Sequence, residues 1–277
     1  MHPCALRTSW WRATTVLLCA SRPATEPELP PVLASIPHAA MPASLAVVMD
    51  GNARWAKAAN LPASAGHAAG VDSLRSLVSH CLALDNVEVL TVYAFSSENW
   101  SRPPAEVDSL MTLIRVTLEA EAEALYARGV RLSFCGDLER LPEALRSLTR
   151  DLAARPAPSP QRLHFCIALS YGGQQEIARA ARKLAERAAA GELPPSDITP
   201  HLLDATLREQ GGPPQPPDLL LRTGGQHRLS NFLLFESAYA EIVVDETLWP
   251  DFGATALARC LEEYAGRQRT FGVRESE

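Results

Sequence analysis

Short apolar runs alternate with stretches of helical periodicity from residue 45 to about residue 268. The apolar runs predict strands at 45–49, 87–95, 130–135, 163–169, 218–221 and 240–244. The periodic stretches predict helices at 67–84, 104–128, 141–154, 174–190, 199–209, 229–238 and 254–268. Strands that alternate with helices in this way are typical of a parallel sheet covered by helices.

The order of the elements therefore predicts an α/β fold, a single domain with a mostly parallel six-stranded sheet covered by helices on both faces. A chain of 277 residues with a 47% apolar composition can bury one sizeable core. We expect the domain to span residues 44–272, with an N-terminal extension at 1–43 and a C-terminal tail at 273–277.

The N-terminal extension differs in composition from the rest of the chain. Its first 25 residues or so carry Arg7, Arg12 and Arg22 together with serines and threonines, and no acidic residue occurs before Glu26, which resembles an organellar transit peptide. The short apolar stretch 13–20 leaves a secretory signal as the alternative. The proline-rich residues 23–42 predict a disordered linker, within which Met41 could serve as another start. No run of eighteen apolar residues exists, so we expect no transmembrane helix.

The charge of the chain limits its ligands. The net charge of -6 argues against nucleic-acid binding, which needs a clustered positive surface. An anionic ligand would therefore have to be bound by local arginines. The 6 cysteines show no CxxC spacing, so the sequence indicates neither a zinc site nor a disulfide framework.

The apolar run 45–49 ends in a polar segment that begins with Asp50. Gly51 lets the backbone approach a ligand closely, and Arg54 can form paired hydrogen bonds with phosphate oxygens. An aspartate beside an arginine at the carboxyl end of a strand suggests a site for a metal and a phosphate. A solvated turn without a ligand is the alternative reading of the same residues.

Arginines follow other predicted strands as well. In an open α/β sheet, ligands bind beyond the carboxyl ends of the strands, where Arg54, Arg102, Arg222 and Arg228 would gather. Four guanidinium groups suit two diphosphates better than one. Arg222 and Arg228 could instead pair with local carboxylates.

Acidic and histidine side chains accompany these arginines. Asp50 and Glu241, with His227, could hold a divalent ion shared by the phosphates, because magnesium prefers oxygen ligands. His67 stands at the start of a predicted helix and is either an anion contact or an ordinary capping residue.

Two enzyme classes are disfavoured by the residues present. A phosphotransferase with Asp50 as nucleophile would want a second acid two residues on, where Asn52 stands. A Walker-type nucleotide enzyme would need a GxxxxGK[ST] motif, which the chain lacks. The remaining option is the transfer of a group that leaves diphosphate behind, which needs a cation for the leaving group and an apolar cavity for a carbocation.

Several long motifs together resemble the cis-prenyltransferase family, of which undecaprenyl diphosphate synthase is the bacterial type. They follow one another in family order between about residues 45 and 272. The motifs are at 48–57, 66–67, 93–103, 136–137, 169–173, 218–225, 228–234, 239–241 and 248–252.

The resemblance implies a homodimeric enzyme whose catalytic domain, 44–272, adds isopentenyl diphosphate units to an allylic diphosphate in cis geometry and makes a polyprenyl diphosphate. It implies that Asp50 is the essential carboxylate and holds Mg²⁺, with His227 and Glu241 as further metal positions. Asn99, with Ser96 nearby, would assist the removal of a proton from the condensed intermediate.

The resemblance also assigns the substrate contacts. One group would bind the allylic diphosphate, a second would bind isopentenyl diphosphate, and aromatic and polar residues would complete the mouth of the site. The substrate-binding positions are Gly51, Asn52, Arg54, Trp55, His67, Ser96, Ser97, Glu98, Trp100, Arg102, Arg222, Arg228 and Ser230.

Among the departures from the family pattern, two concern arginines. Ala63 and Thr270 stand where relatives usually carry arginines, so we expect weaker substrate binding unless other groups compensate. Lys57 lies near the first gap, and Arg269 and Arg274 flank the second.

Two hypotheses of function remain. The first is an active polyprenyl diphosphate synthase, and the second is a weakly active or non-catalytic subunit that stabilises an active partner. The first would touch membranes peripherally through its lipid product. The N-terminal extension favours import into an organelle, a plastid in our interpretation, with the cytoplasm or the surface of the endoplasmic reticulum as alternatives.

Overall fold

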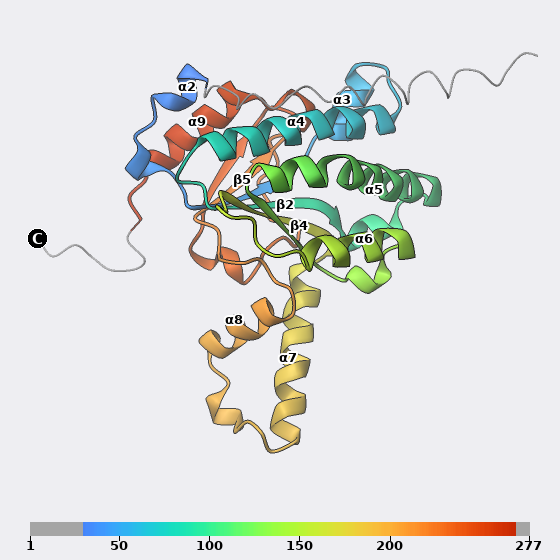
Figure 1. The fold of residues 1–277 in the computed structure, drawn as a ribbon, viewed down its shortest axis with the longest axis vertical. Helices are drawn as coiled ribbons and strands as arrows, with labels where there is room; N and C mark the ends of the chain where they lie inside the picture. The colour runs from blue at the N-terminus through green and yellow to red at the C-terminus, as the bar shows by residue number, and fades with distance from the viewer. Residues whose placement is uncertain (1–29, 270–277) are drawn as a thin grey trace, which may run out of the picture.

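The computed structural model describes residues 30–269, which fold around one sheet of six parallel strands in the order β3-β4-β2-β1-β5-β6 (Figure 1). Every neighbouring pair of strands is parallel, so the sheet is wholly parallel. All the predicted strands are confirmed, with ends shifted by at most about two residues. The strands are β1 (Ser44–Val48), β2 (Val89–Ser96), β3 (Val130–Cys135), β4 (Leu163–Tyr171), β5 (Leu219–Thr223) and β6 (Glu241–Asp245).

Most of the predicted helices are also present. The α-helices are α2 (Pro31–Ala34), α3 (Asn52–Ala58), α4 (Ala63–Ala83), α5 (Pro104–Ala127), α6 (Glu143–Ala153), α7 (Gly173–Ala189), α8 (Pro200–Glu209) and α9 (Ala254–Ala265). The short 3₁₀ helices are η1 (His38–Ala40), η2 (Ser97–Ser101), η3 (Leu138–Arg140), η4 (Pro195–Asp197), η5 (Glu236–Tyr239) and η6 (Trp249–Asp251). Within residues 30–269 no helix is both long enough and apolar enough to cross a membrane.

Two local predictions are wrong. The helix predicted at 229–238 is an irregular loop that becomes helical only at η5, because Ser230, Asn231 and Leu233 have positive φ angles that no right-handed helix allows. Conversely, the segment that begins at Asn52 forms the helix α3 rather than a loop.

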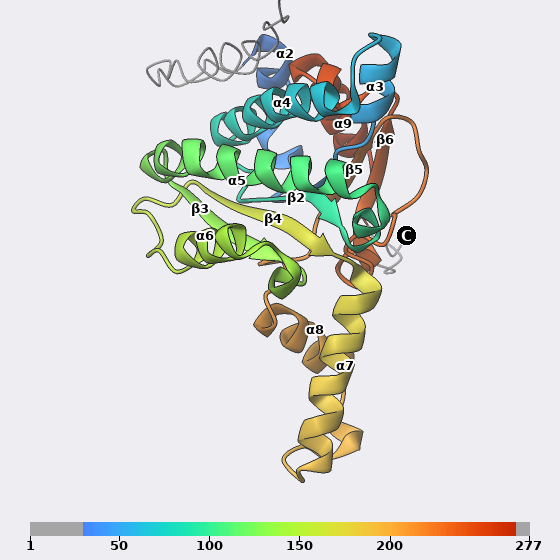
Figure 2. The same ribbon diagram turned by 90° about the vertical axis from the view of Figure 1, so that its right-hand side faces the viewer.

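The two faces of the sheet carry cores of unequal size. Along β1, Leu45 and Val47 point into the larger core, which lies under α4, α5, α6 and α9. Ala46 and Val48 point into a smaller core on the opposite face. The loop residues Phe232 and Leu233, together with the first turn of α7, cover that face, and α7 and α8 then extend away from the sheet (Figures 1 and 2). The predicted α/β class, with helices on both faces, is confirmed.

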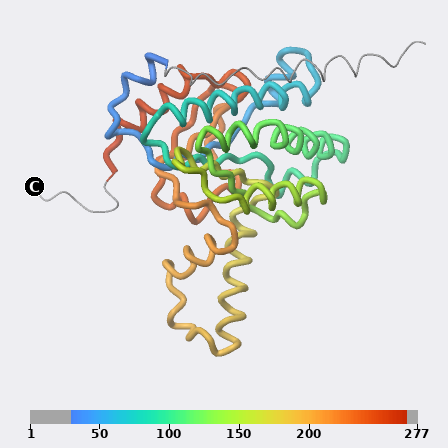
Figure 3. Tube along the Cα trace, in the orientation of Figure 1, coloured from blue at the N-terminus to red at the C-terminus, as the bar shows by residue number. Residues whose placement is uncertain are grey.

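The disordered linker predicted at 23–42 is wrong from residue 31 onward. Leu33 of α2 and Ile36 are buried in the larger core, where α2 packs beside α9 (Figure 3). A start at Met41 would remove both side chains from that core. Residues 1–29, which hold the predicted transit peptide, lie outside the described residues.

Two buried acids lie behind the smaller core. Glu176 is in the first turn of α7 and Glu236 begins η5. The Tyr171 hydroxyl donates to Glu176, whereas neither carboxylate oxygen of Glu236 has a hydrogen-bond partner within the described part of the chain. Burial, reinforced by the negative charge of Glu236, raises the pKa of Glu176 to about 7, and burial also raises the pKa of Glu236. The pair therefore retains a proton near neutral pH.

Replacing Leu33 by alanine should lower the free energy of unfolding by about 2–5 kcal/mol, because the change leaves a cavity in the larger core. Its neighbour Val32 is 36% exposed, so Val32→Ala should change stability by only about 0.5 kcal/mol. Urea denaturation of the full chain measures both variants. Equal effects would show that the packing of α2 does not contribute to the domain.

The buried acid pair predicts that stability falls as pH rises. The pKa of Glu176 is raised in the folded state, so the folded protein binds this proton more tightly than the unfolded chain, and stability is lost as pH rises through about 7. Glu236→Gln removes one charge of the pair, so its Tm should fall less between pH 6 and pH 9 and should exceed the wild-type Tm at pH 9. Calorimetry measures the effect, with the exposed Glu192→Gln as control. Parallel Tm curves for Glu236→Gln and wild type would contradict this reading.

Candidate active site

A cavity of about 590 Å³ opens beyond the carboxyl ends of β1, β2 and β5. It falls within the usual size range of small-molecule sites and has both charged and apolar walls. Its lining residues are Val48, Met49, Asp50, Asn52, His67, Tyr93, Ala94, Ser96, Glu98, Asn99, Arg102, Leu110, Arg222, Ser230 and Asn231.

Arg222, near the end of β5, is buried and organises one side of this cavity. Its Nη2 donates to Asp50 Oδ2 at 2.8 Å. Its Nη1 donates to Ser230 Oγ at 2.6 Å and to the carbonyl oxygen of Arg228. A buried charge is costly unless it is paired and hydrogen-bonded, so these contacts fix Asp50 and the loop after β5 relative to each other.

Two glycines let the chain pass close to Asp50. Gly51 has a φ of 115° and begins α3 beside Leu248, where a Cβ would come within 2.9 Å of a side-chain carbon. Gly224 has a φ of 80°, and a Cβ there would lie 2.3 Å from Arg54 Nη2. The absence of that Cβ lets Arg54 approach Asp50 Oδ1 at 3.2 Å. Both carboxylate oxygens of Asp50 therefore face guanidinium groups.

The segment after β2 is fixed by reciprocal hydrogen bonds. Asn99 Oδ1 accepts from the backbone N–H of Ser96 at 3.0 Å, and the Ser96 side chain accepts from the backbone of Asn99. Between them, the Glu98 carboxylate accepts from Asn231 Nδ2 at 2.9 Å and from Ser97 Oγ at 3.1 Å. Burial works in the opposite direction, but the hydrogen bonds, that from Asn231 first, hold the pKa of Glu98 below its ordinary value.

The opposite wall is formed by α4 and the start of α5. Burial, and then the positive charge of Arg102, lowers the pKa of His67, so this imidazole is neutral at pH 7. Arg102 donates to Glu106 at 3.0 Å. Asn52 Nδ2 donates to the carbonyl oxygen of Met49 at 3.2 Å, whereas its buried Oδ1 has no hydrogen-bond partner within residues 30–269.

Some residues predicted to bind substrate are engaged elsewhere. Trp55 Nε1 donates to Asp251 at 2.8 Å, and Trp100 Nε1 donates to Ser170 Oγ at 2.9 Å. The Trp100 ring also packs edge-on against Phe95, which favours a structural role. The predicted positions outside the cavity lining are Gly51, Arg54, Trp55, Ser97, Trp100 and Arg228.

The predicted metal centre of Asp50, His227 and Glu241 does not form within one chain. Glu241 is the first residue of β6 and, through Leu219 of β5, is in register with Leu45 of β1. It therefore lies at the amino ends of the strands, roughly 16 Å along the strand direction from Asp50. It pairs there with Arg267 at 2.8 Å. His227 is exposed, and no group of three acidic, histidine or cysteine residues within 30–269 could hold a metal. Within residues 30–269 of one chain, the three predicted metal positions are therefore not brought together.

The structure describes Ala63 but not Thr270, the two positions at which relatives usually carry an arginine. Ala63 is exposed at the first position of α4, four residues before His67. Thr270 lies outside the described residues. Arg269, which could have compensated for it, donates to Asp218 at 2.6 Å, and the other Asp218 oxygen accepts backbone N–H groups at the start of β1. In this arrangement Arg269 serves the structure and is not directed at the cavity.

Sequence reasoning missed several residues that line the cavity. Tyr93 lies under the loop after β5, and its hydroxyl donates to the carbonyl oxygens of Tyr171 and Ser230 at 3.2 and 3.3 Å. Asn231 was read only as part of a motif, although asparagine is one of the few residues that adopt a left-handed backbone. Leu110 was read as part of the apolar stripe of α5.

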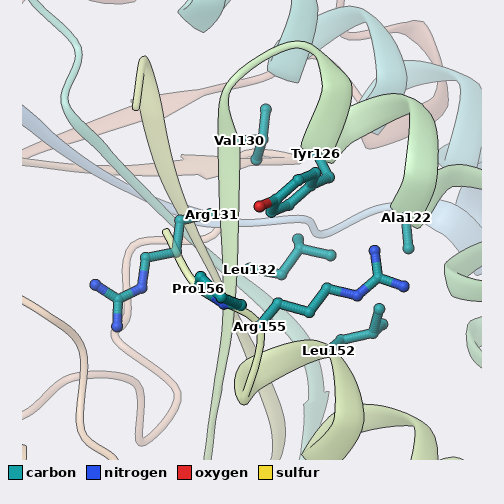
Figure 4. Close-up of a pocket in the computed structure, with 8 residues that line it drawn as sticks. All are labelled: Ala122, Tyr126, Val130, Arg131, Leu132, Leu152, Arg155 and Pro156. Atoms are coloured by element: carbon teal, nitrogen blue, oxygen red, sulfur yellow. The ribbon is translucent and has the colours of Figure 1, made fainter. Parts of the chain in front are cut away.

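A second hollow, beside β3, is far smaller, with a volume of about 10 Å³ (Figure 4). The Arg155 guanidinium lies 5.8 Å from the centre of the Tyr126 ring and pairs with Glu123. This space holds about one water molecule, so it is not a ligand site.

Known proteins resemble the chain over most of its length. Residues 48–272 match the family model described as putative undecaprenyl diphosphate synthase. An isoprenyl transferase of Prochlorococcus marinus is 46% identical over 242 residues, which cover 87% of this chain and 90% of the relative. A ditrans,polycis-undecaprenyl-diphosphate synthase of Pseudomonas putida, specific for (2E,6E)-farnesyl diphosphate, is 47% identical over 84% of this chain and 91% of its own length.

Solved structures show the same fold. The lavandulyl diphosphate synthase of Lavandula x intermedia, in complex with dimethylallyl diphosphate, superposes with a TM-score of 0.78 at 32% identity and covers 84% of this chain and 99% of that one. A probable undecaprenyl diphosphate synthase of Campylobacter jejuni gives a TM-score of 0.66 at 33% identity over 83% of this chain and 98% of that one. The chain belongs to the undecaprenyl diphosphate synthase family of prenyltransferases.

Proposed function

We propose that this chain condenses isopentenyl diphosphate with an allylic diphosphate in cis geometry and makes a polyprenyl diphosphate. The observation that carries the proposal is the cavity itself, in which the buried Arg222–Asp50 pair lies beside an apolar wall that includes Met49, Ala94 and Leu110. One part of such a site suits diphosphate and the other suits a prenyl chain. The names of the relatives support the same reaction.

The residues of the cavity divide the work of this reaction. The bond between the allylic carbon and its diphosphate oxygen breaks, diphosphate leaves with the electron pair, and the carbon joins the double bond of isopentenyl diphosphate, which then loses a proton. Arg102 and Arg222, which line the cavity, and Arg54, which lies beside Asp50 outside that lining, neutralise the two diphosphates. The amide of Asn99 cannot accept this proton. We propose that Asn99 orients a diphosphate so that one of its oxygens lies close to the carbon and accepts the proton. The apolar wall excludes water from the carbocation.

We propose that Asp50 holds Mg²⁺ together with substrate phosphates, although both of its oxygens also face guanidinium groups in the structure. The Asp50 side chain is 28% exposed, and Mg²⁺ is commonly held by one or two carboxylates together with waters and substrate phosphates. When bound, the ion would supply charge neutralisation for the departing diphosphate. A metal role for Glu241 would require a second chain, because within its own chain Glu241 lies at the amino ends of the strands and Asp50 at the carboxyl ends.

We also propose that the chain forms a homodimer through the side of the sheet that ends in β6. β6 is an edge strand of the sheet, and Tyr239 and Ile242 beside Glu241 are exposed at 71% and 44%. Large apolar side chains gathered at an edge strand are typical of an interface. The non-catalytic alternative has no support, since Asp50, Arg222, Ser230 and Asn99 are all present and all line the cavity. Contact with membranes would come through the lipid product.

Asp50→Asn should lower kcat by about 100-fold or more, because it removes a charge engaged with the leaving diphosphate. The assay uses labelled isopentenyl diphosphate, a panel of allylic diphosphates and Mg²⁺, and it is repeated with EDTA, which should abolish turnover until Mg²⁺ is restored. Circular dichroism checks that the variant is folded, and Asp72→Asn, whose partner Arg75 lies on the surface, is the control. Substantial kcat in a folded Asp50→Asn enzyme, or full turnover in EDTA, would exclude the proposed role.

We propose plastid import on the composition of the first residues, which are basic and hydroxylated and lack acids before Glu26. A fusion of residues 1–45 to a fluorescent protein should then enter plastids when expressed in a plant cell. A matched fusion in which the arginines at positions 7, 12 and 22 are replaced by glutamate should stay outside, since transit peptides are poor in acids. Cytosolic or secretory fluorescence of the unaltered fusion would contradict the proposal.

A further inference from the structure

Asn231 joins three parts of the molecule that meet at the cavity. Its backbone oxygen accepts the N–H of Gly173 at 2.7 Å, and its Oδ1 accepts the N–H of Gln174 at 2.9 Å. These are the first two N–H groups of α7, whose own preceding residue, Gly172, provides no side-chain cap. A residue 57 positions away in sequence thus caps this helix.

The cap determines where the other end of the carboxamide points. Because Oδ1 must face the N–H of Gln174, Nδ2 is directed to Glu98 Oε1 at 2.9 Å and to Gln175 Oε1 at 3.1 Å. The space is tight, since a Cβ at Gly172 would lie 2.7 Å from Nδ2. The orientation of the amide is therefore fixed by its surroundings.

Glu98, one of the predicted substrate-binding positions, brings a negative charge to the cavity, and this charge by itself repels a diphosphate. It lines the same cavity as Arg102 and Arg222 and carries the same sign of charge as the substrate. A carboxylate free to turn would compete with diphosphate for those guanidinium groups and would repel it. Asn231 and Ser97 instead hold it by hydrogen bonds.

We propose that Asn231 is a positioning residue that tethers the Glu98 carboxylate to the start of α7 and thereby keeps its charge away from the diphosphate site. The proposal rests on the proposed function for the identity of the substrate. The backbone at position 231 is left-handed, with a φ of 63°, a conformation that asparagine adopts more readily than most residues. Ser230, immediately before it, faces Arg222, so adjacent residues of one loop serve the two sides of the site.

Asn231→Asp tests the tether without removing the cap. The aspartate keeps an oxygen for the N–H of Gln174, and its negative charge is favourable at the N-terminus of α7, so Tm should not fall. The donor to Glu98 is lost and replaced by a like charge. We expect KM for isopentenyl diphosphate to rise about ten- to a hundredfold, the usual loss for a hydrogen bond to a charged group, with a smaller change in kcat.

Removal of the Glu98 charge should rescue the variant. In Asn231→Asp/Glu98→Gln, KM should return to within about threefold of the Glu98→Gln value, which a merely structural defect would not do. Asn60→Ala is the matched control, because Asn60 has a similar left-handed backbone, with a φ of 57°, and does not line the cavity. It should leave KM unchanged.

Binding of inorganic diphosphate, measured by calorimetry, separates this inference from the proposed function. Weaker binding to Asn231→Asp, restored by Glu98→Gln, would support the tether even if no prenyl transfer were found, an outcome that would refute the proposed function alone. Equal affinity of wild type and Asn231→Asp, or the same loss with and without Glu98→Gln, would overturn the tether. A wild-type protein that binds no diphosphate would count against both.

Discussion

The buried guanidinium of Arg222 is the constraint on which the rest of the site depends. A cation that is only 4% exposed must be met by a carboxylate and by further acceptors, and Asp50, Ser230 and the Arg228 carbonyl provide them. These partners come from the end of β1 and from the loop after β5, two strands that are neighbours in the sheet. The charge therefore joins the ends of both strands at the point where a parallel sheet places its ligands.

The loop after β5 cannot satisfy this constraint as a helix. Its apolar residues Leu229, Phe232 and Leu233 follow helical spacing, and all three pack against the smaller core, which is why periodicity alone predicted a helix. Ser230 must nevertheless turn toward Arg222 while Asn231 turns toward α7. Positive φ angles at both residues achieve this, and a regular helix would lose both contacts. Tertiary contacts thus override a correct hydrophobic pattern.

The sequence predicted the strands well because a sheet buried on both faces needs short, almost continuous apolar runs. It predicted the convergence of Asp50 and Arg222 because each stands at the carboxyl end of a parallel strand. The same logic places Glu241, the first residue of β6, at the amino ends of the strands and away from Asp50. Its residue type and the family resemblance had both suggested a metal role, and neither takes account of that geometry. The ordering of α2 was not predictable from composition, because only the docking of Leu33 and Ile36 beside α9 compensates for the proline-rich sequence around them.

The start of α7 connects the cavity to a helix that extends away from the body of the protein. This helix leaves the body of the protein as a projecting arm with α8, yet its first two N–H groups are held by the residue that also holds Glu98 (Figure 2). A shift of the arm would move Asn231, and Asn231 cannot move without changing the surroundings of Ser230 and Glu98. The buried Glu176, one turn further along α7, packs against Tyr171 at the end of β4 and limits such shifts. One loop residue, Asn231, therefore links the start of the projecting arm to the charges that line the cavity.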